Sequence, residues 1–188
     1  MKKFITTLFL ALALTSAAFA VTSPVPPQKG QWGFALEGSL PLYEKADSEA
    51  DSEYIDMPED WFSVPSATRD EYNNLWYKVK IGKKSGWLAQ NGVRLKLSAG
   101  KSKVATDLYK KYKKNKSALR FLLGLNQNEL RKKLGTPTMR ETPYDDSDVN
   151  ILSYELFNNN MTLVVTLREN EVESAIFHEG RAGQTDDD

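Results

Sequence analysis

The chain has 188 residues, with 25 basic and 25 acidic side chains, and 40% of its residues are apolar. This length allows one or two small domains with ordinary buried cores. The chain has no Cys and a single His, His178, which excludes disulfides, thiolate nucleophiles, Cys-type zinc sites and His-rich metal sites. These counts argue against an enzyme, and we expect no cofactor and no bound metal.

The first twenty residues predict a secretory signal peptide. Lys2 and Lys3 precede an uncharged apolar run at residues 4–14, and residues 18–20 (Ala-Phe-Ala) form a small-x-small cleavage pattern. A run of eleven residues is too short to span the roughly 30 Å hydrocarbon layer, and no Cys follows it to carry a lipid anchor. We therefore expect cleavage after Ala20, no membrane span, and a periplasmic or secreted protein.

The first half of the mature chain has the pattern of a small β structure. Residues 21–30 hold three prolines and predict an extended linker. Five short β-like runs follow, at residues 32–36, 40–43, 76–81, 86–89 and 93–97. Trp76 and Trp87 fall on two of these runs, and we predict that both belong to the core.

A polar stretch at residues 44–75 separates the second run from the third, and loops of this length are usually functional or disordered. The aromatic residues Trp61, Phe62 and Tyr72 of this stretch have few apolar neighbours in the sequence, and Tyr43 leads into it. Such loop aromatics either fold back as a lid or stack on a ligand, and the sequence leaves both alternatives open. Our candidate ligand-binding residues are Tyr43, Trp61, Phe62 and Tyr72.

This half resembles bacterial SH3-like (SH3b) domains. The resemblance depends on Leu-Pro-Leu-Tyr at residues 40–43, Trp-Tyr-Lys-Val at residues 76–79 and Gly-Trp-Leu at residues 86–88. It implies a small five-stranded barrel with a binding role, often for cell-wall material or for protein. The long loop at residues 48–74 departs from the short strand that the family usually has.

After residue 100 the pattern becomes helical. Apolar residues recur at near-helical spacing through residues 104–123, and Gly124 is expected to end this helix. Asn126 is a typical cap for a second short helix at residues 127–134, which a Gly and a nearby Pro end. The remainder predicts three strands, at residues 151–157, 161–167 and 172–177.

This second half resembles the SmpA/OmlA family, the type of the outer-membrane assembly lipoprotein E. The resemblance depends on Leu-Gly-Thr-Pro at residues 134–137, which closes a short helix ahead of three antiparallel strands. The chain lacks the family's lipid-attachment Cys. The resemblance therefore implies protein binding more readily than a role in membrane assembly.

Charge is strongly sorted along the chain. Residues 78–140 carry eighteen basic and two acidic side chains, whereas residues 44–77 carry ten acidic and two basic, and residues 141–188 carry twelve acidic and two basic. Lysines on the exposed side of the first helix either are merely solvated, dock on the acidic blocks, or hold an external anionic partner. The anionic-surface candidates are Lys110, Lys111, Lys113 and Lys114. Nucleic acid is not expected as a partner of an exported chain.

The sequence has no catalytic constellation. It lacks a nucleophile motif with a base and a phosphate-binding glycine loop, and His178 stands at the end of the last predicted strand. A cell-wall hydrolase fragment is therefore disfavoured.

We predict a mainly β chain with an α+β second module: a small SH3-like β-barrel, followed by two helices and a three-stranded antiparallel sheet. The expected divisions are a signal peptide at residues 1–20, a linker at 21–30, the barrel at 31–98, the α+β domain at 101–180 and a disordered acidic tail at 181–188. The expected function is non-enzymatic recognition of a cell-envelope ligand, either peptidoglycan or protein. The alternative is an envelope structural or outer-membrane assembly accessory protein that contacts anionic lipid or polymer through its Lys-rich helix.

Overall fold

The computed structural model describes residues 30–97, 100–157, 160–180 and 182. The expected signal peptide, nearly all of the linker and most of the acidic tail lie outside the described residues. Within them the chain is mainly β, as the sequence predicts, and it forms two antiparallel sheets and three helices. None of the described helices has the length and apolar character needed to cross a membrane.

The N-terminal half, residues 30–97, contains eight strands. They are β1 (Trp32–Ala35), β2 (Ser39–Tyr43), β3 (Ser52–Asp56), β4 (Phe62–Ser63), β5 (Ser66–Arg69), β6 (Leu75–Ile81), β7 (Lys84–Ala89) and β8 (Val93–Lys96). In the C-terminal half, residues 100–182, the described residues form three helices and four strands. They are α1 (Lys103–Lys114), the 3-10 helix η1 (Lys116–Leu122), α2 (Gln127–Leu134), β9 (Met139–Thr142), β10 (Val149–Glu155), β11 (Met161–Arg168) and β12 (Glu171–Glu179).

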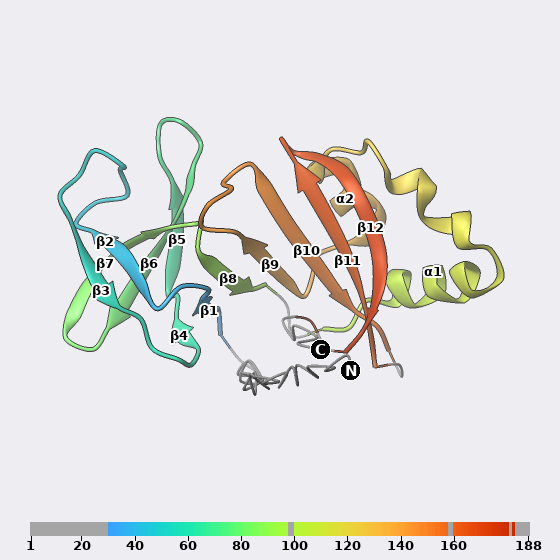
Figure 1. Cartoon of the computed structure of the whole chain (residues 1–188), viewed down its shortest axis with the longest axis horizontal. Helices are drawn as coiled ribbons and strands as arrows, with labels where there is room; N and C mark the ends of the chain where they lie inside the picture. Colours follow the sequence, from blue (N-terminus) through green and yellow to red (C-terminus); the bar gives the residue numbers. More distant parts are fainter. Residues whose placement is uncertain (1–29, 98–99, 158–159, 181, 183–188) are drawn as a thin grey trace, which may run out of the picture.

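One sheet runs through both halves (Figure 1). Its strand order is β12-β11-β10-β9-β8-β1-β4, and β8 pairs with β9 in antiparallel register from Val93–Thr142 to Lys96–Met139. The second sheet, of order β3-β2-β7-β6-β5, lies within the N-terminal half. The sequence pattern does not predict β9, although this strand joins the two halves into one continuous sheet.

The stretch at residues 44–75, expected to be one long loop, contains β3, β4 and β5. All four residues of β5 are exposed, so the strand has no apolar alternation that sequence reasoning could detect. It forms because its backbone pairs with β6, from Ser66–Lys78 to Arg69–Leu75. In β3 only Ile55 is buried, so this strand also lacks the apolar alternation that would predict it from the sequence.

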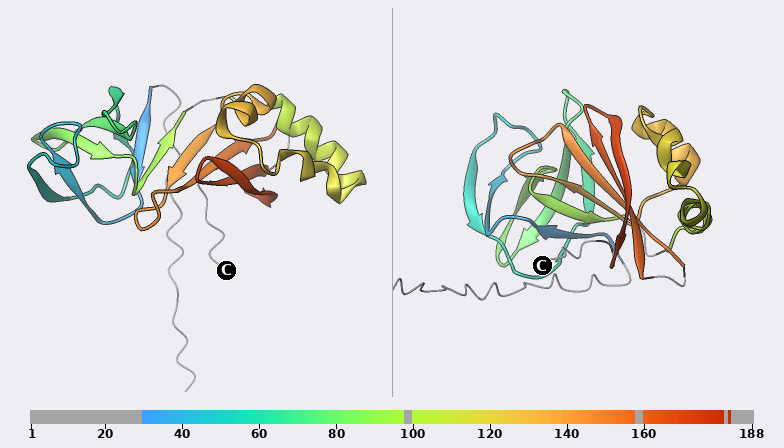
Figure 2. Two further views of the ribbon diagram at one scale, coloured as in Figure 1. Left: turned by 90° about the horizontal axis from the view of Figure 1, so that it is seen from above. Right: turned by 45° about the vertical axis from the view of Figure 1, so that its right-hand side comes forward.

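Two main cores fill the molecule. The core of the N-terminal half lies between the five-stranded sheet and β1 and β8, and it includes Leu40, Val79 and Leu95. In the C-terminal half the three helices cover one face of β10, β11 and β12, where Leu122 and Leu163 are fully buried (Figure 2).

The second predicted helix is confirmed to the residue. The Asn126 side chain accepts hydrogen bonds from the backbone N–H groups of Asn128 and Glu129, and the Glu129 carboxylate accepts one from the Asn126 backbone. This reciprocal capping box satisfies helix N–H groups that lack partners within the helix. The first predicted helix is instead broken at Asn115, which ends α1 and caps η1 through a bond from the Ser117 N–H to its side chain.

Candidate functional site

The outer face of the five-stranded sheet carries two aromatic rings from neighbouring strands. On β2, Leu40 and Leu42 point into the core, so Tyr43 points outward. On β7, Gly86 and Leu88 are buried and Trp87 points outward, directly opposite Tyr43 in the β2–β7 register. Both rings are partly exposed.

Trp76 supports Tyr43 from β6. The two rings meet edge to face with centroids 5.1 Å apart, and the Trp76 indole N–H donates to the Asp70 carboxylate at 2.9 Å. Trp76 is only 2% exposed, yet it lies outside the core cluster because Tyr77 and Val79 occupy the inward positions of β6. The prediction that both tryptophans belong to the core is therefore right in part: Trp76 is buried, although on the outer side of the sheet, whereas Trp87 is partly exposed there.

The outer face extends into the C-terminal half through two tyrosines. Tyr54 of β3 and Tyr144, from the segment between β9 and β10, share a hydrogen bond of 3.1 Å between their hydroxyl groups, and they are 68% and 37% exposed. That bond raises the pKa of Tyr144, and desolvation adds to the shift. A small cavity of about 70 Å³ lies between Tyr43 and Tyr144. We call Tyr43, Tyr54, Trp87 and Tyr144 the aromatic face.

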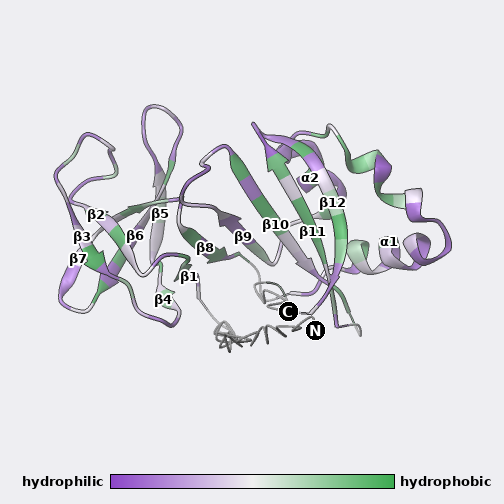
Figure 3. Ribbon diagram, in the orientation of Figure 1, coloured by the Kyte–Doolittle hydropathy of each residue, from purple (hydrophilic) through white to green (hydrophobic). Residues whose placement is uncertain are grey.

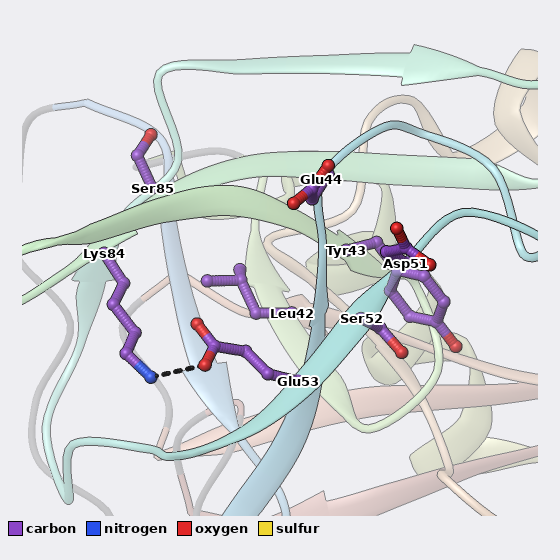
Figure 4. Close-up of a pocket in the computed structure, with 8 residues that line it drawn as sticks. All are labelled: Leu42, Tyr43, Glu44, Asp51, Ser52, Glu53, Lys84 and Ser85. Atoms are coloured by element: carbon purple, nitrogen blue, oxygen red, sulfur yellow. Dashed lines mark hydrogen bonds and ion pairs between the residues drawn. The ribbon is translucent and has the colours of Figure 1, made fainter.

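A larger shallow hollow of about 440 Å³ opens beside Tyr43, where β2, β3 and β7 meet. Its charged residues are Glu44, Asp51, Glu53 and Lys84, and the Lys84 ammonium lies 2.8 Å from a Glu53 carboxylate oxygen. Figure 4 shows this ion pair on one side of Leu42, with Tyr43 and Asp51 on the other side. Three carboxylates and one ammonium suit a ligand that offers amine and hydroxyl groups.

Two predicted ligand-binding residues lie inside the protein. Phe62 is 5% exposed and belongs to the core of the N-terminal half, and Trp61 is 8% exposed and packs against Phe34 with ring centroids 5.6 Å apart. Of the two alternatives that the sequence leaves open, the structure shows these aromatic residues folded back into the protein. Neither ring forms part of an open surface. The physical reason is that β4 pairs with β1, with Phe62 opposite Gly33, where a side chain would collide with the Phe62 ring.

Tyr72 stands apart from the aromatic face. It lies in the turn between β5 and β6, is 69% exposed, and its backbone N–H donates to Asp70. No contact among the described residues joins its ring to Tyr43. Of the four predicted ligand-binding residues, the structure therefore places only Tyr43 within the aromatic face.

The predicted anionic-surface residues are all exposed on α1: Lys110, Lys111, Lys113 and Lys114. Lys110 pairs with Asp107 of the same helix at 2.9 Å. Among the described residues, no ion pair joins α1 to the acidic blocks at residues 44–77 and 141–182. The alternative of internal docking therefore has no support in the described contacts.

Three members of the aromatic face were not predicted from the sequence: Tyr54, Trp87 and Tyr144. Trp87 could have been placed, because the alternation of Gly86 and Leu88 on β7 leaves it facing outward. Tyr54 and Tyr144 are 90 positions apart, and no pattern in the sequence connects them.

The described residues contain no group of three His, Asp or Glu side chains that could hold a metal ion. His178 is exposed on β12. Comparisons with protein-family models, with curated proteins and with solved structures found no match. The two family resemblances of the sequence therefore stay expectations.

Proposed function

We propose that this protein is an exported, non-enzymatic binding protein that recognises a cell-envelope ligand, peptidoglycan or protein, through an SH3-like module. The observation that carries the proposal is the aromatic face beside the acidic hollow. Partly exposed aromatic rings on a sheet stack on sugar rings and on peptide side chains while their scaffold stays rigid.

The arrangement suits a ligand with both apolar and cationic groups. Lys78 lies over one side of the Trp87 ring, with its ammonium 5.0 Å from the ring centroid, and Trp76 holds the edge of Tyr43. These contacts restrict both rings before a ligand arrives, which lowers the entropy lost on binding. The carboxylates of the hollow then provide partners for amine groups of peptide or cell-wall material.

The test is binding of the full exported protein to isolated peptidoglycan and to envelope extract. We expect Trp87→Ala and Tyr54→Ala each to weaken capture by about fivefold or more, because truncating an aromatic side chain that anchors an interface costs more than about 1 kcal/mol of binding energy. The melting temperature should change little for Tyr54→Ala, since this side chain is 68% exposed.

Tyr72→Ala is the matched control, because Tyr72 is an equally exposed tyrosine outside the aromatic face. We expect it to bind like the wild type. Equal capture by Trp87→Ala, Tyr54→Ala and the wild type would contradict the proposed site. Capture of a protein but not of peptidoglycan would identify the ligand as protein.

A further inference from the structure

The helical layer, residues 103–134, is strongly positively charged. It carries ten basic side chains, all exposed, and two acidic ones, Asp107 and Glu129. Asp107 pairs with Lys110, and the Glu129 carboxylate is engaged in the cap of α2. Among the described residues, Lys110 is the only basic side chain of this layer with an ion-pair partner.

The same layer exposes three large apolar side chains: Val104 on α1, and Phe121 and Leu123 in and just after η1. In and just after η1, Leu119 and Leu122 are buried, whereas Phe121 and Leu123 are 51% and 49% exposed. The Lys133 ammonium of α2 lies 5.9 Å from the Phe121 ring centroid, so apolar and basic groups share one surface. Figure 3 shows hydrophobic residues within η1 between hydrophilic stretches of the chain.

A surface that exposes both apolar groups and lysines suits some anionic partners better than others. A polyanionic polymer or a nucleic acid would use the lysines and leave Phe121 and Leu123 in water. An anionic bilayer uses both, because acyl chains accept the apolar side chains while lysine ammonium groups stay among the lipid phosphates. Juxtamembrane basic residues each contribute about 1 kcal/mol toward anionic lipid.

We infer that the helical layer is a peripheral docking surface for anionic lipid bilayers, with Phe121 and Leu123 inserting at the interface and the α1 and α2 lysines meeting the headgroup phosphates. This surface lies at the opposite end of the molecule from the aromatic face (Figures 1 and 2). The two surfaces do not overlap, so a ligand on the aromatic face leaves the helical layer free for a membrane. The inference is independent of the function proposed for the aromatic face.

Co-sedimentation with lipid vesicles tests this inference. The protein is recovered after export, and its mass is measured so that a retained signal sequence cannot cause binding. We expect binding to phosphatidylcholine vesicles that contain phosphatidylglycerol, weak binding to pure phosphatidylcholine, and loss of binding as salt rises. Lys113→Gln with Lys114→Gln should lower the partition coefficient roughly 30-fold.

Phe121→Ser with Leu123→Ser is the decisive variant. It should lower vesicle binding about tenfold or more and leave retention on a heparin column unchanged, because heparin offers charge without an apolar phase. The matched controls are Lys80→Gln with Lys83→Gln, exposed lysines near the end of β6 and in the turn that follows it, and Ile176→Ser, which is 47% exposed on β12. These controls should bind vesicles like the wild type.

Two outcomes would overturn the inference. One is a wild-type protein that does not sediment with anionic vesicles. The other is a Phe121→Ser, Leu123→Ser variant that sediments as well as the wild type, which would reduce the surface to a site for soluble polyanions.

Discussion

At the scale of the residue, side-chain direction decides function more than residue type. Trp76 and Trp87 are large apolar residues on strands, and size alone suggests the core. On β6, however, Leu75, Tyr77 and Val79 take the inward positions, so Trp76 is left on the outer face with Lys78. Alternation along a strand outweighs hydrophobicity because successive side chains must point to opposite faces.

Asp70 ties the β5–β6 turn to Trp76. Desolvation raises the pKa of Asp70, but bonds donated by the Trp76 indole, the Asn74 side chain, and the Asn74 and Tyr72 backbones outweigh it and hold the pKa below its ordinary value of 3.8. A folded-state pKa below the unfolded one means that the contribution to stability is complete above this ordinary value. It is lost as the pH falls through the folded-state pKa.

We therefore expect the NMR signal of the Trp76 indole N–H to shift when the pH is lowered below about 3.8. The Trp87 indole serves as the internal control, and its signal should not follow this titration. In Asp70→Asn the shift should disappear, because an amide does not titrate. A Trp76 signal that stays constant in the wild type down to about pH 2 would show that this bond is absent in solution.

At the scale of the element, the contact between β2 and β7 depends on a glycine. These strands share a single register pair, Tyr43–Trp87. A Cβ on Gly86 would lie 2.6 Å from the Tyr43 carbonyl oxygen and 2.7 Å from Leu42 Cγ. Because the nearest atom belongs to the backbone, a side chain at Gly86 would push β2 away from β7.

Gly86→Ala should therefore lower the free energy of unfolding by about 1–3 kcal/mol and weaken ligand capture at the aromatic face. Gly38→Ala is the control, since a Cβ there would meet nothing within 4 Å, and its stability should stay within about 0.5 kcal/mol of the wild type. Chemical denaturation measures both variants. Unchanged stability in Gly86→Ala would mean that β2 and β7 leave more space at Gly86 than these two distances imply.

At the scale of the whole molecule, the β8–β9 pairing makes the two halves parts of one sheet. Arg140 of β9 reinforces this junction, since its guanidinium donates to the side chains of Gln90 and Asn150, one from each half. Arg140 is 9% exposed, and desolvation lowers its pKa. A buried guanidinium that bridges two halves favours cooperative unfolding because exposing either half breaks its hydrogen bonds.

The chain provides a separate probe for each half. All four tryptophans precede residue 88, and the three helices of the described part of the chain follow residue 102. We expect tryptophan fluorescence and far-ultraviolet circular dichroism to report the same denaturation midpoint. Arg140→Met should lower both midpoints together, by about 1–3 kcal/mol of stability, whereas two separate transitions in the wild type would show that the halves unfold independently.

Local patterns determined much of the fold. The strands with inward-facing apolar residues and the bounds of α2 follow from alternation and from a capping box only four residues long, so no distant contact is needed to predict them. Tyr43 also belongs to this group, because it ends a strand whose inward residues are Leu40 and Leu42.

Only the tertiary structure decided the rest. The strand β5 has no buried residue, and β9 carries the polar residues Arg140 and Thr142 at buried positions, so both depend on backbone pairing with a partner strand. Trp61 and Phe62 turned inward because β4 pairs with β1. Tyr54 and Tyr144 meet across 90 residues of chain because the β8–β9 pairing places the two halves edge to edge, a contact that no local pattern encodes.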